Sequence, residues 1–105
     1  MRHLVLRDQD LAALRGTFRR FAAVREVRVF GSRATGRARR ASDLDLAIFA
    51  PEASPAEWAD LCDSLESAPL IYELDLVRTE QTANARLLEK ITREGVPIYP
   101  DEPAR

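Results

Sequence analysis

The spacing of apolar residues along the chain predicts three amphipathic helices. In the first they recur at intervals of three and four, which is typical of a helix packed on a sheet, and Asp8 is placed to cap it. The second begins at the capping sequence Ser54-Pro55-Ala56-Glu57. The third spans about 81–94 and ends at Gly95. The residues expected to face the core are Leu11, Leu14, Phe18 and Phe21, then Trp58, Leu61, Cys62 and Leu65, then Leu87, Leu88 and Ile91.

Shorter apolar runs between these helices predict strands. They cover 24–30, 44–50 and 70–77, and 96–99 can add a short strand at a sheet edge. This order predicts an α+β fold, a mixed α/β arrangement in which a small mixed β-sheet carries helices mainly on one face. The other face is then free to meet a ligand. With 105 residues the chain is expected to form one domain over 1–99, followed by a frayed tail over 100–105.

Three aspartates interrupt the apolar strands. Asp43 and Asp45 lie two residues apart, so in a strand both side chains project from the same face, and Asp75 lies in the next predicted strand. Aspartate is depleted in strands and is almost never buried without a partner, so these positions need a reason. Carboxylate oxygens suit Mg²⁺, which keeps other coordination positions for water and substrate phosphate. The pattern therefore favours a metal site for phosphoryl or nucleotidyl transfer, in which Asp75 completes a two-metal clamp or takes a proton from an attacking hydroxyl.

The sequence before these acids favours a phosphate contact. A strand runs directly into Gly31 and Ser32, where a glycine lets the backbone approach a phosphate and the serine hydroxyl adds a donor. Arg33 and Arg37 follow in the connecting loop, with Arg39 and Arg40, where a triphosphate would lie if the acids hold its metal. A structural alternative is that the acids form ion pairs with arginines such as Arg33 or Arg37.

Charge is distributed unevenly along the chain. The net charge is −1, yet residues 1–40 hold 11 arginines against 3 acids, a balance of 11 − 3 = +8, and the remainder holds 5 basic and 14 acidic residues, a balance of −9. The first part therefore looks suited to anions, although 15 arginines against a single lysine also fits a bias in genome base composition. Neither interleaved aromatics nor a recognition-helix pattern accompanies these arginines, so no direct contact with nucleic acid is expected.

Several other classes of protein are disfavoured. Cys62 is the only cysteine and His3 the only histidine, so an internal disulfide and a zinc constellation are excluded. No apolar run approaches about eighteen residues and the first residues lack the pattern of a signal peptide. A cytoplasmic location without membrane contact is therefore expected.

Taken together, several segments resemble the minimal nucleotidyltransferases of the DNA polymerase beta superfamily. They are Gly31-Ser32-Arg33-Ala34-Thr35-Gly36, the run from Ser42 to Leu46, Leu74-Asp75-Leu76-Val77, and the closing run from Arg93 to Tyr99. The resemblance implies the nucleotidyltransferase fold, ATP as substrate and two Mg²⁺ ions. It also implies that Gly31 and Ser32 hold the terminal phosphates and that Asp43, Asp45 and Asp75 are the catalytic carboxylates and metal ligands.

The acceptor is less well defined by the sequence. Larger members of the superfamily bind the acceptor with a second domain, which is not expected within these 105 residues. The resemblance points to short members that act as the antitoxin of a helical HEPN-type toxin, which they adenylylate on a tyrosine. Two alternatives stay open: transfer to a small molecule with a helical partner subunit, or neutralisation of the partner by binding alone. Whether the chain forms a homo- or hetero-oligomer is also open.

Overall fold

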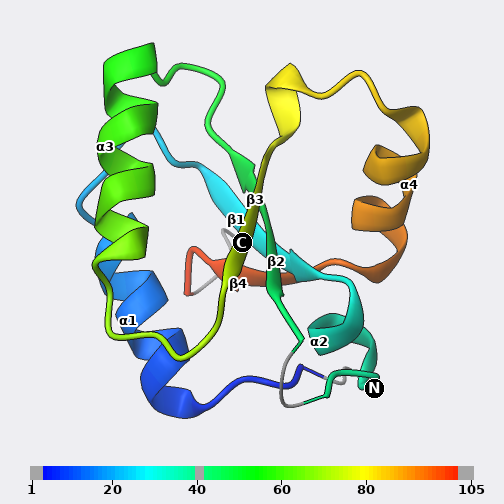
Figure 1. Ribbon diagram of the computed structural model, residues 1–105. Helices are drawn as coiled ribbons and strands as arrows, with labels where there is room; N and C mark the ends of the chain where they lie inside the picture. Colours follow the sequence, from blue (N-terminus) through cyan, green and yellow to red (C-terminus); the bar gives the residue numbers. More distant parts are fainter. Residues whose placement is uncertain (1–3, 40–41, 102–105) are drawn as a thin grey trace.

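The computed structural model describes residues 4–39 and 42–101, which form one mixed sheet flanked by helices (Figure 1). The helices are α1 (Asp8–Phe18), α2 (Ser32–Thr35), α3 (Pro55–Glu66) and α4 (Ala85–Glu94), and a 3-10 turn covers Thr79–Gln81. The strands are β1 (Glu26–Phe30), β2 (Leu44–Phe49), β3 (Leu74–Arg78) and β4 (Val96–Tyr99). This is the mixed α/β arrangement that the sequence predicts.

The sheet has the strand order β3-β2-β1-β4. β1 pairs antiparallel with both β2 and β4, whereas β2 and β3 run parallel. A parallel pair needs a crossover connection, and α3 supplies it between β2 and β3. The order leaves β3 at one edge of the sheet and β4 at the other.

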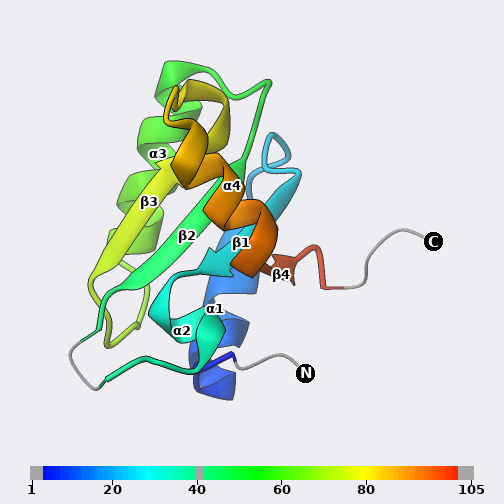
Figure 2. The same ribbon diagram turned by 90° about the vertical axis from the view of Figure 1, so that its right-hand side faces the viewer.

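The larger core lies between the sheet and the helix pair α1 and α3. Side chains of β1 and β2 alternate, so every second residue points to this pair. The buried residues at its centre are Leu14 and Phe18 of α1, Val27 and Val29 of β1, Leu44, Leu46 and Ile48 of β2, and Leu61 and Leu65 of α3. Figures 1 and 2 show both helices on this face and α4 on the opposite one.

A smaller cluster lies under α4 on the opposite face. Ile91 of α4 packs with Phe30 of β1 and Ala47 of β2, and Leu87 packs against the same group. Because α4 covers only part of this face, the remaining part can carry polar groups without burying them completely. The predicted site faces this same side of the sheet.

Some element boundaries differ from those expected from the sequence. β3 begins four residues later than predicted, because Leu70 and Tyr72 pack against the core from an irregular connection. The last helix begins at Ala85, where the side chain of Asn84 accepts a hydrogen bond from the N–H of Leu87. Asp8 lies in the first turn of α1 and does not cap it.

Other sequence predictions agree with the structure. Ser54 and Glu57 form the predicted capping box at the start of α3. Gly95 follows α4 as expected, and a Cβ there would overlap the carbonyl oxygen of Ile91. Within the predicted tail, Asp101 forms ion pairs with Arg15 of α1 and with Arg19, the residue that caps this helix, while 102–105 lie outside the described residues.

Candidate active site

The structure brings Asp45 and Asp75 to the same place on neighbouring strands. The two are direct partners in the parallel register of β2 and β3. Leu44 and Leu46 point to the core beneath α1 and α3, so Asp45 between them projects from the α4 face. Leu74 and Leu76 direct Asp75 to that face in the same way. The two carboxylates therefore lie side by side where α4 leaves the sheet uncovered.

The electrostatics of Asp45 reflect this crowding. Burial is the largest effect and the neighbouring carboxylate of Asp75 the next, and together they raise the pKa of Asp45 from 3.8 to about 6. The charge of Asp43 supplies a smaller part of this rise in pKa, and the charge of Lys90 opposes it. Accumulated negative charge of this kind is relieved by a bound cation, which favours the ionised carboxylates.

Gly31 forms the wall beside Asp45. It lies between β1 and α2 with φ of 74°, a left-handed conformation that favours glycine. A Cβ at this position would overlap Oδ2 of Asp45. Glycine therefore allows the backbone of the turn to lie close to the carboxylate of Asp45. Ser32, which is half-buried, follows directly at the start of α2.

Asp43 is exposed immediately before β2 and belongs to the site less tightly. Among residues 4–39 and 42–101 no three acidic, histidine or cysteine side chains are gathered into a group that could hold an ion. Asp45 and Asp75 therefore form a close pair, the charge of Asp43 acts on Asp45 from just before the same strand, and a shared site of all three carboxylates stays a prediction.

The donor set nevertheless fits a hard divalent cation. Carboxylate oxygens are the ligands that Mg²⁺ prefers, and it is commonly bound by one or two of them together with substrate phosphates. Of the ion pairs between described residues, none involves Asp43, Asp45 or Asp75. Within 4–39 and 42–101, then, neither Arg33 nor Arg37 neutralises these acids, contrary to the structural alternative.

Arg33 has a different place from the one its sequence position suggests. Its side chain is only 4% exposed, and its guanidinium donates hydrogen bonds to the carbonyls of Val5 at 3.2 Å, Arg39 at 3.3 Å and Ser42 at 2.9 Å. It also lies over the ring of Tyr72, 4.0 Å from the centroid. With its donors bonded to backbone carbonyls, Arg33 holds the loop that leads to the first aspartate, which is a different role from the predicted phosphate contact.

The other loop arginines remain available. Arg37 and Arg39 are exposed, and neither forms an ion pair with a described residue. Arg40 lies outside the described residues. Arg33 and Arg37 were the two predicted phosphate contacts. Of these two, Arg37 has the exposed side chain that can reach a ligand.

Lys90 is a site residue that the sequence reasoning missed. It directly precedes Ile91, which packs on Phe30 and Ala47 beside the acid pair, and its charge acts on Asp45. It is also the only lysine beside 15 arginines. That contrast was a signal available in the sequence, since an ammonium group offers a flexible point charge that a guanidinium does not.

This combination of a mixed sheet, a glycine–serine turn and paired strand carboxylates defines a nucleotidyltransferase. A family profile described as "Polymerase beta, Nucleotidyltransferase" matches residues 12–104, and the chain belongs to this family. A search of curated protein sequences found no significant match. Within the described residues, no helix is long and apolar enough to cross a membrane.

Two solved structures share the fold. One is a crystal structure of the toxin–antitoxin MntA-HpeT in a mutant with two aspartates, two positions apart, changed to glutamate; it has a TM-score of 0.67, 20% identity, and covers 90% of this chain and 73% of that chain. The other is a crystal structure of a toxin–antitoxin with AMP-PNP, with a TM-score of 0.69, 21% identity, and coverage of 89% and 73%.

Proposed function

We propose that this chain is a Mg²⁺-dependent nucleotidyltransferase that transfers AMP from ATP to a hydroxyl, acting as the antitoxin of a HEPN-type helical toxin whose tyrosine is the acceptor. The observation that carries the proposal is the pairing of Asp45 with Asp75 on adjacent strands, with Gly31 packed against the first carboxylate. Membership of the nucleotidyltransferase family supports the reaction type.

The chemistry needs a cation, an oriented hydroxyl and a place for the triphosphate. Bound Mg²⁺, held by Asp45 and Asp43 with Asp75 beside them, would neutralise charge on the phosphates. The acceptor oxygen bonds to the α-phosphorus, the bond to the β-phosphate oxygen breaks, and pyrophosphate leaves with the electron pair. Asp75 orients the hydroxyl and takes its proton. Gly31 and Ser32 contact the phosphates, and Arg37 and Lys90 supply positive charge at the rim.

The choice of nucleotide and partner rests on the solved structures. One neighbour contains AMP-PNP, an ATP analogue, and both are toxin–antitoxin structures. The mutant of the other neighbour changes two aspartates with the same spacing as Asp43 and Asp45. These parallels support ATP as donor, a toxin as partner and the paired aspartates as the catalytic centre of this chain.

The test is adenylylation of a partner. The chain is incubated with ATP, Mg²⁺ and the product of the adjacent gene, and the intact mass of both proteins is measured. We expect the partner to gain an AMP residue on a tyrosine. Asp45→Asn should abolish this transfer, whereas Asp60→Asn, which changes an exposed acid of α3, should leave it intact.

Three results would lead to different conclusions. An adduct on a small molecule supplied as acceptor would replace the toxin with a small-molecule substrate. A tight complex with no adduct would indicate neutralisation by binding alone. Full transfer by Asp45→Asn would refute the assignment of the catalytic centre.

A further inference from the structure

β3 presents an unpaired edge to its surroundings. It is the last strand in the order β3-β2-β1-β4, so among the strands of the described residues it has β2 as its single neighbour. The N–H of Leu44 donates to the carbonyl of Glu73 at 2.8 Å, which shows that the polar backbone groups of Glu73 face β2. Backbone groups of successive residues in a strand point alternately to opposite sides. Those of Asp75 and Val77 therefore also face β2, and those of Leu74 and Leu76 face outward.

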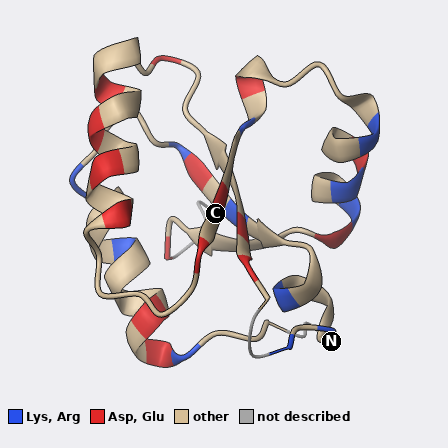
Figure 3. Cartoon of the chain, viewed as in Figure 1, with Lys and Arg blue, Asp and Glu red and all other residues tan. Residues whose placement is uncertain are grey.

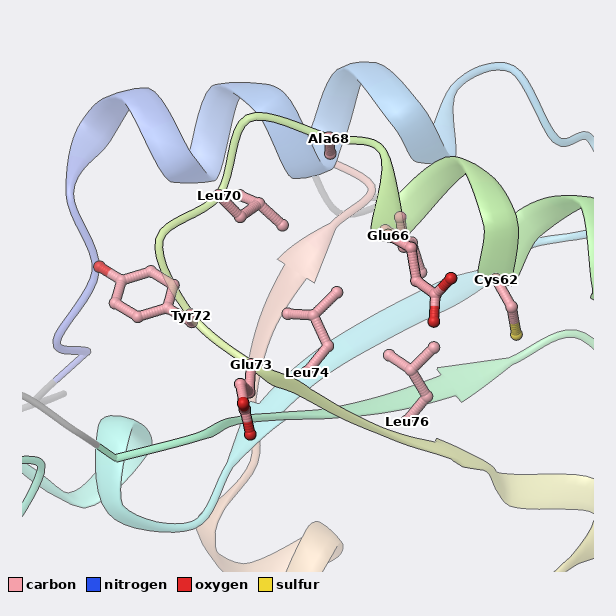
Figure 4. Close-up of a pocket in the computed structure, with 9 residues that line it drawn as sticks. Cys62, Glu66, Ala68, Leu70, Tyr72, Glu73, Leu74 and Leu76 are labelled. Atoms are coloured by element: carbon pink, nitrogen blue, oxygen red, sulfur yellow. The ribbon is translucent and has the colours of Figure 1, made fainter.

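An apolar cavity lies directly against this edge. Its volume is about 490 Å³, and it is lined by the second half of α3, the connection after it and β3 (Figure 4). Leu65, Leu74 and Leu76 line its apolar part, and no residue of β1 or β2 takes part. The cavity thus lies at the flank of the sheet, where the side chains of an added strand would reach it.

The surroundings of this edge are acidic and partly apolar. Glu66 and Glu73 line the cavity and are both exposed. Residues 42–77 contain nine acidic and no basic residues, and Figure 3 shows the acids along α3 and the neighbouring strands. Ile71, in the connection before β3, is 66% exposed. Such a surface complements a segment that carries both apolar and basic side chains.

The same edge borders the active site. Leu74 and Leu76 project to the cavity side of β3, whereas Asp75 between them projects to the opposite side, beside Asp45. A strand added to this edge would alternate in the same way. Its apolar side chains would enter the cavity while the side chain between them would lie next to Asp75.

From this juxtaposition we infer that the free edge of β3 is the acceptor-docking surface: an extended, basic segment of a protein partner pairs with it as a fifth strand. The segment has a hydroxyl side chain flanked on both sides by apolar residues. Its hydroxyl is presented to Asp75 and its apolar neighbours fill the cavity. Because this role rests on the transferase function proposed above, edge pairing and nucleotide binding are measured separately.

The probe is a capped synthetic peptide with the sequence Arg-Leu-Tyr-Leu-Arg. Amide hydrogen exchange of the full chain is followed by NMR with and without it, in the presence of MgATP. We expect exchange at Leu74 and Leu76 to slow by about tenfold or more when the peptide binds. The amides of Asp75 and Val77, which already face β2, should change little and serve as internal controls.

Charge variants test the second feature of the surface. Glu73→Lys should weaken peptide binding by about threefold or more, because Glu73 lies two residues before Asp75, on the face where the arginines of the added strand project, so an attraction becomes a repulsion. Asp60→Lys has the same kind of charge change on an exposed α3 residue that does not line the cavity, and it should alter binding by less than about twofold. A peptide with glutamate in place of both arginines should bind more weakly to the unaltered chain.

The outcomes separate this inference from the proposed function. If AMP is transferred to the tyrosine peptide while exchange at Leu74 and Leu76 stays unchanged, the docking surface is wrong and the transferase function stands. If both amides become protected but calorimetry finds no MgATP binding, the edge is confirmed as a peptide site and the function fails. Equal binding of the arginine and glutamate peptides would overturn the basic character of the segment.

Discussion

Gly31 links the conformation of a turn to the position of a catalytic carboxylate. Gly31→Ala should cost about 1–2 kcal/mol of stability, because the new Cβ adopts a disfavoured φ and overlaps Asp45. MgATP affinity, measured by calorimetry, should fall with it because the carboxylate must move. Gly16→Ala is a matched control: a Cβ there meets no atom within 4 Å and lies in α1, so it should stabilise the chain slightly. Unchanged MgATP affinity in Gly31→Ala would contradict this role.

Asp45 should make the stability of the metal-free chain depend on pH. Its pKa is about 6 in the folded chain and about 3.8 ordinarily, so the unfolded chain loses this proton first as pH rises. The contribution of Asp45 to stability is therefore present below about pH 4 and is lost as pH rises through about 6. Urea unfolding in EDTA should show this fall, which Asp45→Asn should remove and Mg²⁺ at neutral pH should offset.

A control is needed because the pKa of other carboxyl groups is lowered in the folded chain, so their effect on stability changes with pH in the opposite direction. The hydrogen bond from Arg7 lowers the pKa of Asp10, so that group contributes stability that is lost as pH falls. The difference between the original chain and Asp45→Asn isolates the one carboxyl. Parallel curves for the two proteins would show that Asp45 is not the source.

Alanine variants of Arg33 and Arg37 should differ in their effects on stability and on MgATP binding. Arg33→Ala should cost about 3 kcal/mol or more, because it leaves buried carbonyl groups without a donor. Arg37→Ala should alter stability by less than about 0.5 kcal/mol, since this side chain is exposed, and should instead weaken MgATP binding. Thermal unfolding and calorimetry on both variants measure the contrast. The reverse pattern would restore Arg33 to the phosphate site.

These two arginines show how far sequence reasoning reaches for single residues. Both lie in the basic segment before the aspartates, Arg33 in α2 and Arg37 after it, and no local sequence pattern distinguishes them. Their difference depends on the N-terminal segment and on Tyr72, which are 28 or more residues away along the chain. The spacing of Asp43 and Asp45, in contrast, is a local property of one strand and could be interpreted directly.

Among the helices, α4 is held by few buried residues. Only Ile91 is fully buried, although the sequence also placed Leu87 and Leu88 in the core. Ile91→Ala should destabilise the chain by about 2–4 kcal/mol, because it leaves a cavity over Phe30 and Ala47. Leu88→Ala should cost about 1 kcal/mol or less, since this side chain is only half-buried. Chemical denaturation measures both, and equal costs would contradict the packing.

The strands and helices differ in how well their limits could be predicted. The capping box at Ser54 is a local interaction and gave the start of α3 correctly. β3 was predicted to begin at Leu70 because the run is apolar, yet residues 70–73 form an irregular connection in which Leu70 and Tyr72 pack on the core and Ile71 is exposed. An apolar run indicates that some of its residues are buried. Its pairing as a strand depends on the neighbouring strand, and β2 begins opposite Leu74.

For the molecule as a whole, ligand binding should couple the site to stability. A ligand that binds only the folded chain raises the unfolding free energy, by about 2.7 kcal/mol at a concentration of about 100 times Kd. MgATP should therefore raise the thermal midpoint of the chain, and Asp45→Asn should remove most of that increase. ATP with EDTA is the control for metal dependence. Equal stabilisation of both proteins would place nucleotide binding elsewhere.

The amino-acid order was sufficient for the fold class and for the candidate carboxylates. Some features depend only on neighbouring residues in the chain and can therefore be predicted from the sequence. They are the helical and strand periodicities, the capping residues and the two-residue spacing of Asp43 and Asp45. The family resemblance rests on the same short segments.

The tertiary structure determined which side chains come into contact. The pairing of Asp45 with Asp75, the buried position of Arg33, the approach of Lys90 and the open edge of β3 all join segments far apart in sequence. Such contacts depend on strand order, register and the placement of α4, which are fixed by packing of the whole domain. Periodicity can indicate the face on which a residue lies, but three-dimensional packing determines what that face contacts.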